Sequence, residues 1–151
     1  MYKLLLAVHI LGAVIWVGGA TTVQVLTTRI RRADEPAYMA RITQDLEKVG
    51  QFVFLPSSII VLLAGIGLVT DGGWGFGSFW VLFGLVAIIA SAVTGAAYLG
   101  PESGRIGRLI EERGPEDPEI QQRMARIFFV SRIELAVLLL VVIDMAVKPG
   151  A

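Results

Sequence analysis

Cysteine is absent from the sequence, and histidine occurs once, at His9. Without cysteine the chain forms no disulfide and offers no thiol nucleophile, and iron–sulfur clusters held by thiolates are excluded. The short motifs of soluble enzymes are also missing, among them Gly-x-Ser-x-Gly, the phosphate-binding loop, His-Glu-x-x-His and the dinucleotide fingerprint. The sequence therefore points away from the common soluble enzyme classes, and it leaves open whether the protein is catalytic.

Charge is scarce as well. Only 17 % of the residues are charged, and 13 basic residues balance 13 acidic ones. Together with 55 % hydrophobic residues and a mean hydropathy of +0.71, this composition is far from that of a soluble domain. The zero net charge and the lack of a basic, aromatic-rich patch argue against nucleic acid as a partner. We expect one transmembrane domain over residues 1–151, with the lipid bilayer as its surroundings.

What the sequence has instead is four apolar runs, each long enough at about 1.5 Å per residue to cross a hydrocarbon core of about 30 Å. They predict an all-α, polytopic membrane four-helix bundle with helices at about 4–28, 36–70, 79–99 and 118–147. A signal peptide is the competing interpretation of the first run, since Lys3 precedes it, but most of the nearby charge follows the run, at Arg29, Arg31 and Arg32.

Proline and glycine mark the expected helix ends. Asp34-Glu35-Pro36 and Asp117-Pro118 are typical of helix starts, which extends the second and fourth helices beyond the membrane. Gly100-Pro101 is expected to end the third helix, with a separate short helix over Glu102–Arg113. Pro56, followed by two serines, predicts a kink in the second helix.

The basic residues predict the orientation of the bundle. Segments 29–48 and 101–126 carry five basic residues each, and only Lys3, Arg132 and Lys148 lie elsewhere. By the positive-inside rule both segments are cytoplasmic, so both termini are external and the helical extensions form a small cytoplasmic cap. In the third helix, Gly84, Ile88, Ala92 and Ala96 share a face that suits packing inside the bundle or, alternatively, a homodimer seam.

Polar residues within the apolar runs form two expected layers. His9 and Asp144 are placed at one level near the external face, and we expect them to share a polar site. Gln24, Gln51, Arg132 and Glu134 form the second layer, in the inner half of the bilayer. Glu134 requires a partner in hydrocarbon, with Arg29, Gln24 and Gln51 as candidates, or else a proton. The alternatives are that Asp144 pairs with Lys148, that Arg132 snorkels, and that His9 is a packing residue.

Two stretches resemble a known set of small bacterial membrane proteins. The stretches are Leu6-Ala7-Val8-His9-Ile10-Leu11-Gly12-Ala13-Val14-Ile15-Trp16-Val17-Gly18-Gly19 and, more weakly, Val147-Lys148-Pro149-Gly150. The set contains an uncharacterised family of about this size, the copper-resistance D type and the HemJ-type protoporphyrinogen oxidases. The uncharacterised family is the most similar. The resemblance implies a multi-pass protein of the bacterial cytoplasmic membrane.

The resemblance to the HemJ type implies haem b, with the first-helix histidine, His9, as its ligand. That type also uses a lysine in the third helix, and segment 79–99 has none, which argues against the oxidase activity itself. An axial imidazole needs an apolar slot, which Gly65 and Gly67 on the second helix and Trp80 and Phe83 on the third supply at the level of His9. The second axial ligand is Met145, His9 of another protomer, or nothing.

Three functions stay open at this point. The first is a haem-binding or redox-related module with His9 as the metal ligand. The second is a non-catalytic scaffold or accessory subunit in a homodimer or a larger membrane complex. The third is a protein that handles copper or a small solute. One histidine and four scattered methionines supply a copper site poorly, and a bundle of this size leaves little lumen for transport.

Overall fold

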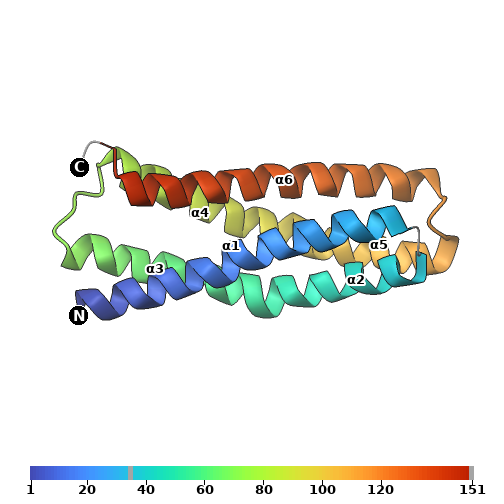
Figure 1. Cartoon of the computed structure of the whole chain (residues 1–151), viewed down its shortest axis with the longest axis horizontal. Helices are drawn as coiled ribbons and strands as arrows, with labels where there is room; N and C mark the ends of the chain where they lie inside the picture. The colour runs from blue at the N-terminus through green and yellow to red at the C-terminus, as the bar shows by residue number, and fades with distance from the viewer. Residues whose placement is uncertain (34–35, 150–151) are drawn as a thin grey trace.

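The computed structural model describes residues 1–33 and 36–149, and every regular element in these ranges is helical. The order along the chain is α1 (Tyr2–Ala33), α2 (Pro36–Val49), η1 (Gly50–Phe54), α3 (Leu55–Asp71), α4 (Phe79–Thr94), η2 (Gly95–Leu99), α5 (Gly100–Arg113) and α6 (Pro118–Val147). The helices form an elongated bundle with both termini at one end (Figure 1). We call this the terminal end, and we call the opposite end, where α1 and α5 end and α6 begins, the polar end.

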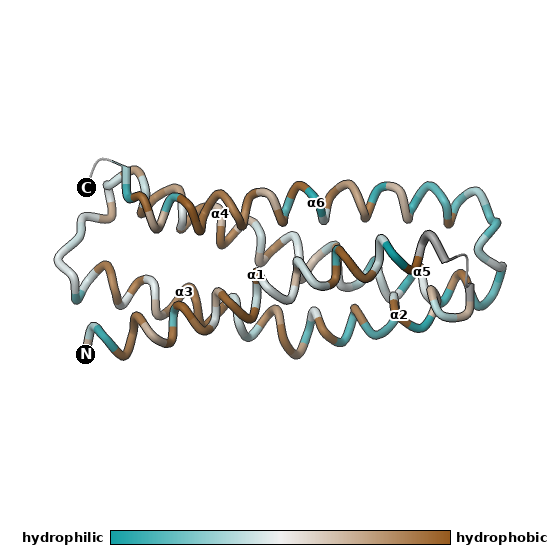
Figure 2. Tube along the Cα trace, in the orientation of Figure 1, coloured by the Kyte–Doolittle hydropathy of each residue, from teal (hydrophilic) through white to brown (hydrophobic). Residues whose placement is uncertain are grey.

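The surface of the bundle fits a membrane. Three continuous helical stretches are long and apolar enough to cross a bilayer, namely Tyr2–Ile30, Ala37–Asp71 and Phe79–Arg113. The apolar residues gather toward the terminal end and the hydrophilic ones at the polar end (Figure 2). Large apolar side chains such as Leu63, Val86 and Leu140 are more than half exposed, which suits contact with lipid and not with water. The prediction of an all-α membrane bundle is therefore confirmed.

The last helix of the bundle, α6, differs in composition from the three apolar stretches. It has 30 residues and runs beside the others along the bundle (Figure 1). Its apolar half contains Arg132, Glu134 and Asp144, and α6 is not among the stretches that are apolar enough to cross a membrane. That α6 spans the bilayer as a fourth transmembrane helix stays a prediction.

The predicted break at Gly100-Pro101 is wrong. The helix continues from α4 through η2 into α5 as one stretch, Phe79–Arg113. In η2 the amide of Gly100 donates to the carbonyl of Gly95, which makes a π-helical turn with one extra residue. Pro101 follows at the start of α5, where its missing N–H matters least, so the wider turn lets the helix pass the proline without ending.

A second π-helical turn, η1, precedes Pro56 in the same way. There the amide of Leu55 donates to the carbonyl of Gly50. The sequence thus repeats one spacing, since Gly50 precedes Pro56 and Gly95 precedes Pro101 by the same number of residues. The two turns lie side by side, because a Cβ atom at Gly50 would be 3.7 Å from Cα of Gly100. The expected irregularity at Pro56 is therefore a widened turn, and Ser58 donates a hydrogen bond of 2.8 Å to the Leu55 carbonyl.

At the polar end, α2 and α5 pack closely. A Cβ atom at Gly107 of α5 would lie 2.7 Å from the Ala40 carbonyl oxygen and 2.6 Å from Cγ of Gln44, so only glycine allows this approach. Ile106 and Ile120 are fully buried in the core between α2, α5 and α6. In α4, Gly84 and Ile88 of the predicted face are buried within the chain and Ala92 is half-buried, whereas Ala96, in η2, is exposed; a homodimer seam on this face stays a prediction.

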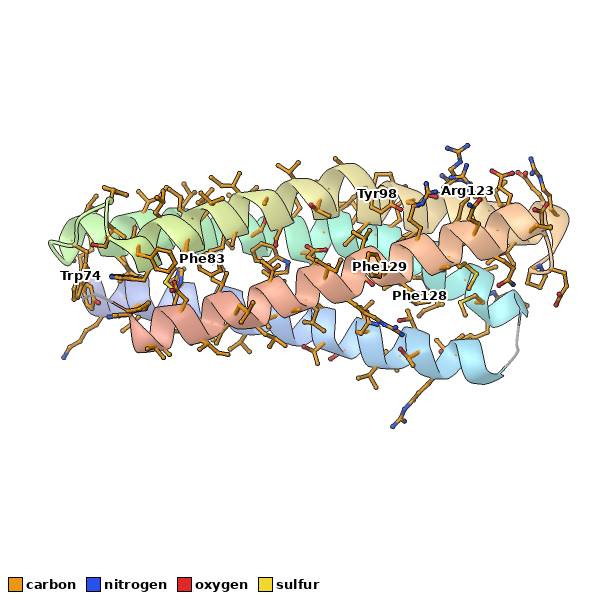
Figure 3. The ribbon with its side chains drawn as sticks, turned by 90° about the horizontal axis from the view of Figure 1, so that it is seen from above. Trp74, Phe83, Tyr98, Arg123, Phe128 and Phe129 are labelled. Atoms are coloured by element: carbon orange, nitrogen blue, oxygen red, sulfur yellow. The ribbon has the colours of Figure 1, made fainter. Side chains whose placement is uncertain are left out.

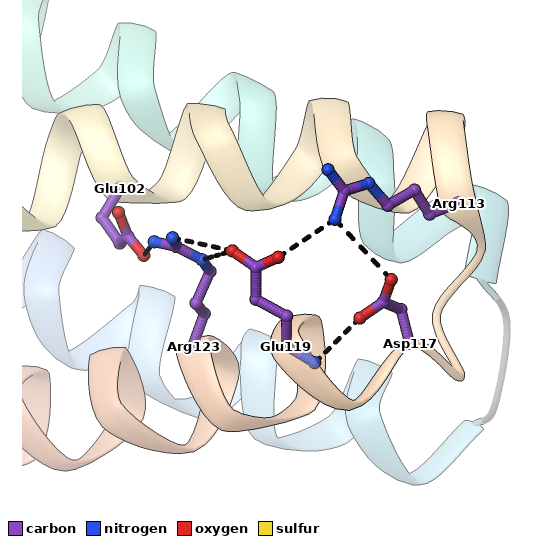
Figure 4. A network of polar contacts seen from close by, with 5 residues as sticks. All are labelled: Glu102, Arg113, Asp117, Glu119 and Arg123. Carbon is purple, nitrogen blue, oxygen red and sulfur yellow. Dashed lines mark hydrogen bonds and ion pairs between the residues drawn. The ribbon is translucent and has the colours of Figure 1, made fainter.

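The start of α6 follows the sequence prediction. The Asp117 side chain caps the helix by accepting from the Glu119 amide at 2.8 Å, and Pro118 occupies the first turn. Arg123 binds Glu102 at 2.7 Å and Glu119 at 2.9 Å, and Arg113 binds Glu119 at 3.0 Å (Figure 4). The Arg123–Glu102 and Arg113–Glu119 pairs join α5 to α6, and the Arg123–Glu119 pair lies within α6. The helix start predicted at Asp34-Glu35 lies outside the described residues, although α2 does begin at Pro36.

Candidate functional site: two cavities

The first cavity is a cleft at the terminal end, between α1, α3, α4 and α6, which we call the terminal cleft. It brings together four of the predicted site residues, His9, Gly65, Trp80 and Met145. Its other lining is mostly apolar and aromatic: Leu6, Val61, Leu62, Ile66, Leu68, Val69, Trp74, Phe76, Val81, Leu85 and Ile88, with Tyr2 and Lys148 at the rim. The sequence thus located the walls of this cleft around the single histidine.

The imidazole of His9 is held in one orientation. Its Nδ1 lies 2.9 Å from the carbonyl oxygen of Val61, and because a carbonyl only accepts, Nδ1 carries the proton and donates. The other ring nitrogen, Nε2, then keeps its lone pair for a ligand. Gly65 makes room for the ring, since a Cβ atom there would lie 3.2 Å from Cε1 of His9. This arrangement favours metal ligation by Nε2.

Two residues expected in this cleft lie elsewhere. Gly67 faces Leu5, whose Cδ1 would be 3.1 Å from a Cβ atom at the glycine. Phe83 stacks on Phe79 with 6.1 Å between the ring centroids and packs against the core cluster around Trp16. Trp74 and Phe83 both lie toward the terminal end of the bundle, and Arg123 lies toward the polar end (Figure 3). The level of Gly67 and Phe83 along the bundle was therefore predicted well, but the direction in which each residue faces was not.

Asp144 and Lys148 do not form the side-chain ion pair that was one alternative suggested by their spacing in the sequence. Lys148 ends α6 in a left-handed conformation with φ of 49°, which turns its side chain away from the helical position. Its ammonium group lies 4.9 Å and 5.4 Å from the ring centroids of Trp74 and Trp80. Asp144 is buried, and its Oδ2 has no hydrogen-bond partner within the described residues.

The direct hydrogen bond between His9 and Asp144 is also missing from the described structure, because the Val61 carbonyl takes Nδ1. Asp144 is not among the residues that line the cleft. A polar site shared by these two residues stays a prediction.

The second cavity, which we call the central cavity, lies deeper in the bundle beside the two π-helical turns. It has a volume of about 130 Å³ and is partly open to the outside. The carboxylate of Glu134, near the middle of α6, lines it, with Oε1 3.9 Å from where a Cβ atom at Gly95 would stand. Ser131 donates a hydrogen bond of 3.1 Å to Oε1 of Gln24, which joins α6 to α1 in the same cavity.

The predicted inner polar layer is therefore formed in part. Gln24 and Glu134 line one cavity, whereas Gln51 and Arg132 are exposed and lie outside it. Arg29 is exposed too, and none of the three proposed partners forms a hydrogen bond or ion pair with Glu134 in the described ranges. Hydroxyl residues that sequence reasoning missed, including Thr27, Thr43, Ser58, Ser91 and Ser103, also line this cavity. The repeated Gly-Pro spacing was the signal that could have indicated it.

No group of three or more His, Asp or Glu side chains within residues 1–33 and 36–149 is arranged to hold a metal ion. A metal at His9 would therefore need its remaining ligands from elsewhere, as a porphyrin supplies them.

Comparison with known proteins gives one result. No curated protein and no solved structure matches the chain. The profile of one family, described as predicted integral membrane protein (DUF2269), matches residues 3–149. This match agrees with the apolar helical bundle, and it gives no support for a relation to the copper-resistance D or HemJ types. Because the match covers almost the whole chain, the protein belongs to this family of integral membrane proteins.

Proposed function

We propose that the protein is a membrane module that holds a b-type haem in the terminal cleft, with Nε2 of His9 as an axial ligand. The observation that supports this most is the hydrogen bond of 2.9 Å from Nδ1 of His9 to the Val61 carbonyl. It fixes the tautomer, orients the ring and leaves Nε2 unprotonated, as second-shell carbonyls do for metal-binding histidines.

The lining of the cleft is mostly apolar and aromatic, which supports an apolar ligand such as haem. Gly65 lets α3 approach the imidazole, and Trp80 and Val81 offer buried apolar surface on α4. Met145 lines the cleft and packs onto Gly84, so its thioether is one source of a second axial ligand. At the rim, Lys148 and Tyr2 offer polar contacts for carboxylate groups near the membrane surface. A haem bound there supplies one-electron chemistry, and the protein supplies the ligand and excludes water.

The test is haem titration into the protein purified in detergent, followed by absorption spectroscopy of the oxidised and reduced forms. We expect a saturable Soret band in the wild type and its loss in His9→Gly, because the only imidazole of the chain is removed. Added free imidazole should restore the band in His9→Gly, since the cleft then holds the missing ligand.

A folded wild-type protein without saturable haem binding, or a His9→Gly variant with an unchanged spectrum, would contradict the proposal. Circular dichroism and gel filtration show that each sample is folded. The first outcome would favour the other interpretations, a scaffold or accessory subunit of a membrane complex or a protein that handles copper or a small solute.

A further inference from the structure

We propose that the central cavity binds a lipophilic organic cation, whose positive charge pairs with the carboxylate of Glu134. This site is separate from the terminal cleft, and the inference does not depend on haem binding at His9.

The charge of the cavity comes from one residue. Glu134 is the only ionisable side chain that lines the cavity, and the described residues provide it with neither a hydrogen bond nor an ion pair. A carboxylate held away from water lacks the solvation that stabilises its charge. A cationic ligand supplies the missing partner, because no lysine, arginine or histidine among the described side chains lines the cavity.

The rest of the lining selects the kind of cation. Trp16 is buried against the cavity, and the rings of Phe54 and Phe128 also line it, so aromatic faces are available to a delocalised positive charge. A divalent metal ion would need several oxygen ligands, and only one carboxylate is present. An organic cation with apolar groups therefore fits the lining better than an inorganic ion.

The backbone explains why space exists at this depth. Each π-helical turn adds one residue to its helix and widens it locally, and such turns are frequent at functional sites. Gly50, Gly95 and Gly100 border the cavity, and none of them carries a side chain to fill it. The Glu134 carboxylate lies opposite Gly95, so the ligand charge would be held between α6 and the widened turn η2.

The experiment uses tetraphenylphosphonium as the probe cation and triphenylphosphine oxide as a neutral probe of similar shape. Binding is measured by isothermal titration with the full-length protein in nanodiscs of neutral lipid. We expect saturable binding of the cation to the wild type and at least about tenfold weaker binding to Glu134→Gln. A desolvated charge pair is worth more than the about 1.4 kcal/mol that a factor of ten represents.

The matched control is Glu112→Gln, which makes the same substitution at an exposed carboxylate of α5 and should bind the cation as the wild type does. Glu134→Asp keeps the charge and should recover part of the affinity. Equal affinity of Glu134→Gln and wild type for the cation, or no saturable binding by the wild type, would overturn the proposal. If Glu134→Gln does not fold, the comparison of the two probes on the wild type tests the proposal instead. Equal affinity of the wild type for the charged and the neutral probe would also overturn the proposal.

Discussion

The two cavities differ in what the side chain proposed to bind the ligand, His9 or Glu134, lacks. In the terminal cleft, one nitrogen of His9 already donates to the Val61 carbonyl, and the other is left with a lone pair. In the central cavity, the Glu134 carboxylate has no partner in the described structure and faces hydroxyl and aromatic side chains. The first arrangement offers an electron pair to a metal, and the second offers a negative charge to a cation. One small membrane bundle can thus carry two chemically distinct sites.

Both cavities contrast with the polar end. There α2 and α5 approach closely at Gly107, and Ile106 and Ile120 are fully buried. The close packing of this end holds the helices together, whereas Gly65 and the two π-helical turns leave space in the apolar part. Substitutions of single glycines can therefore distinguish the glycines that stabilise the bundle from the glycines that leave space for a ligand.

The largest expected effect on stability is at the polar end. Gly107→Val should destabilise the bundle by about 1 to 3 kcal/mol or more, because the new side chain meets the backbone of Ala40, which cannot move aside cheaply. Gly18→Val makes the same change where a Cβ atom meets nothing within 4 Å, and it should cost much less. Thermal unfolding in detergent compares the two. Equal losses of stability would show that helix propensity, and not the contact of α2 with α5, sets the cost.

An intermediate effect is expected in the terminal cleft. Gly65→Ala places a methyl group 3.2 Å from Cε1 and 3.4 Å from Nδ1 of His9, which should displace the ring and lower haem affinity several-fold without unfolding the protein. Gly95→Ala, whose nearest neighbour is Oε1 of Glu134 at 3.9 Å, should leave haem binding unchanged. Haem titrations of the two variants measure the difference. A loss of haem affinity in Gly95→Ala alone would place the haem in the central cavity instead.

The smallest expected effect concerns the ion pairs between α5 and α6. The hydrogen bond from Arg123, together with its charge, holds the pKa of Glu119 below its usual value of 4.5. A lowered folded-state pKa adds stability above the unfolded pKa, and this stability is lost as the pH falls through the folded pKa. Acid should therefore destabilise the wild type slightly more than Glu119→Gln, as followed by melting temperature from pH 6 to about pH 3. Glu112→Gln should keep the wild-type dependence, and a steeper acid loss in Glu119→Gln would contradict this sign.

Much of the fold could be predicted because it depends on local signals. Apolar length located the three stretches that can cross a bilayer, and Asp117 with Pro118 located the start of α6. The walls around His9 were found in part, since Gly65, Trp80 and Met145 lie at its level. Counting residues along a helix gives depth reliably, because the rise per residue is constant.

What could not be predicted depends on neighbours in space. The helix passes Pro101 because a π-helical turn forms against the matching turn at Gly50, and no local rule distinguishes this from a helix end. Phe83 lies outside the cleft because its ring stacks on Phe79 and packs against the core cluster around Trp16. Lys148 turns onto the rings of Trp74 and Trp80 because it ends α6 in a left-handed conformation. That Glu134 lacks a partner could be seen only once the positions of three other helices were known.

The central claim is that the bundle has two separate ligand sites, one at His9 and one at Glu134. The most direct test is a tetraphenylphosphonium titration of wild-type protein loaded with haem and of the same protein without haem, with the Soret band recorded throughout. The account predicts the same affinity for the cation in both samples and an unchanged Soret band at saturation. Displacement of haem by the cation, or loss of cation binding in the haem-loaded protein, would contradict it.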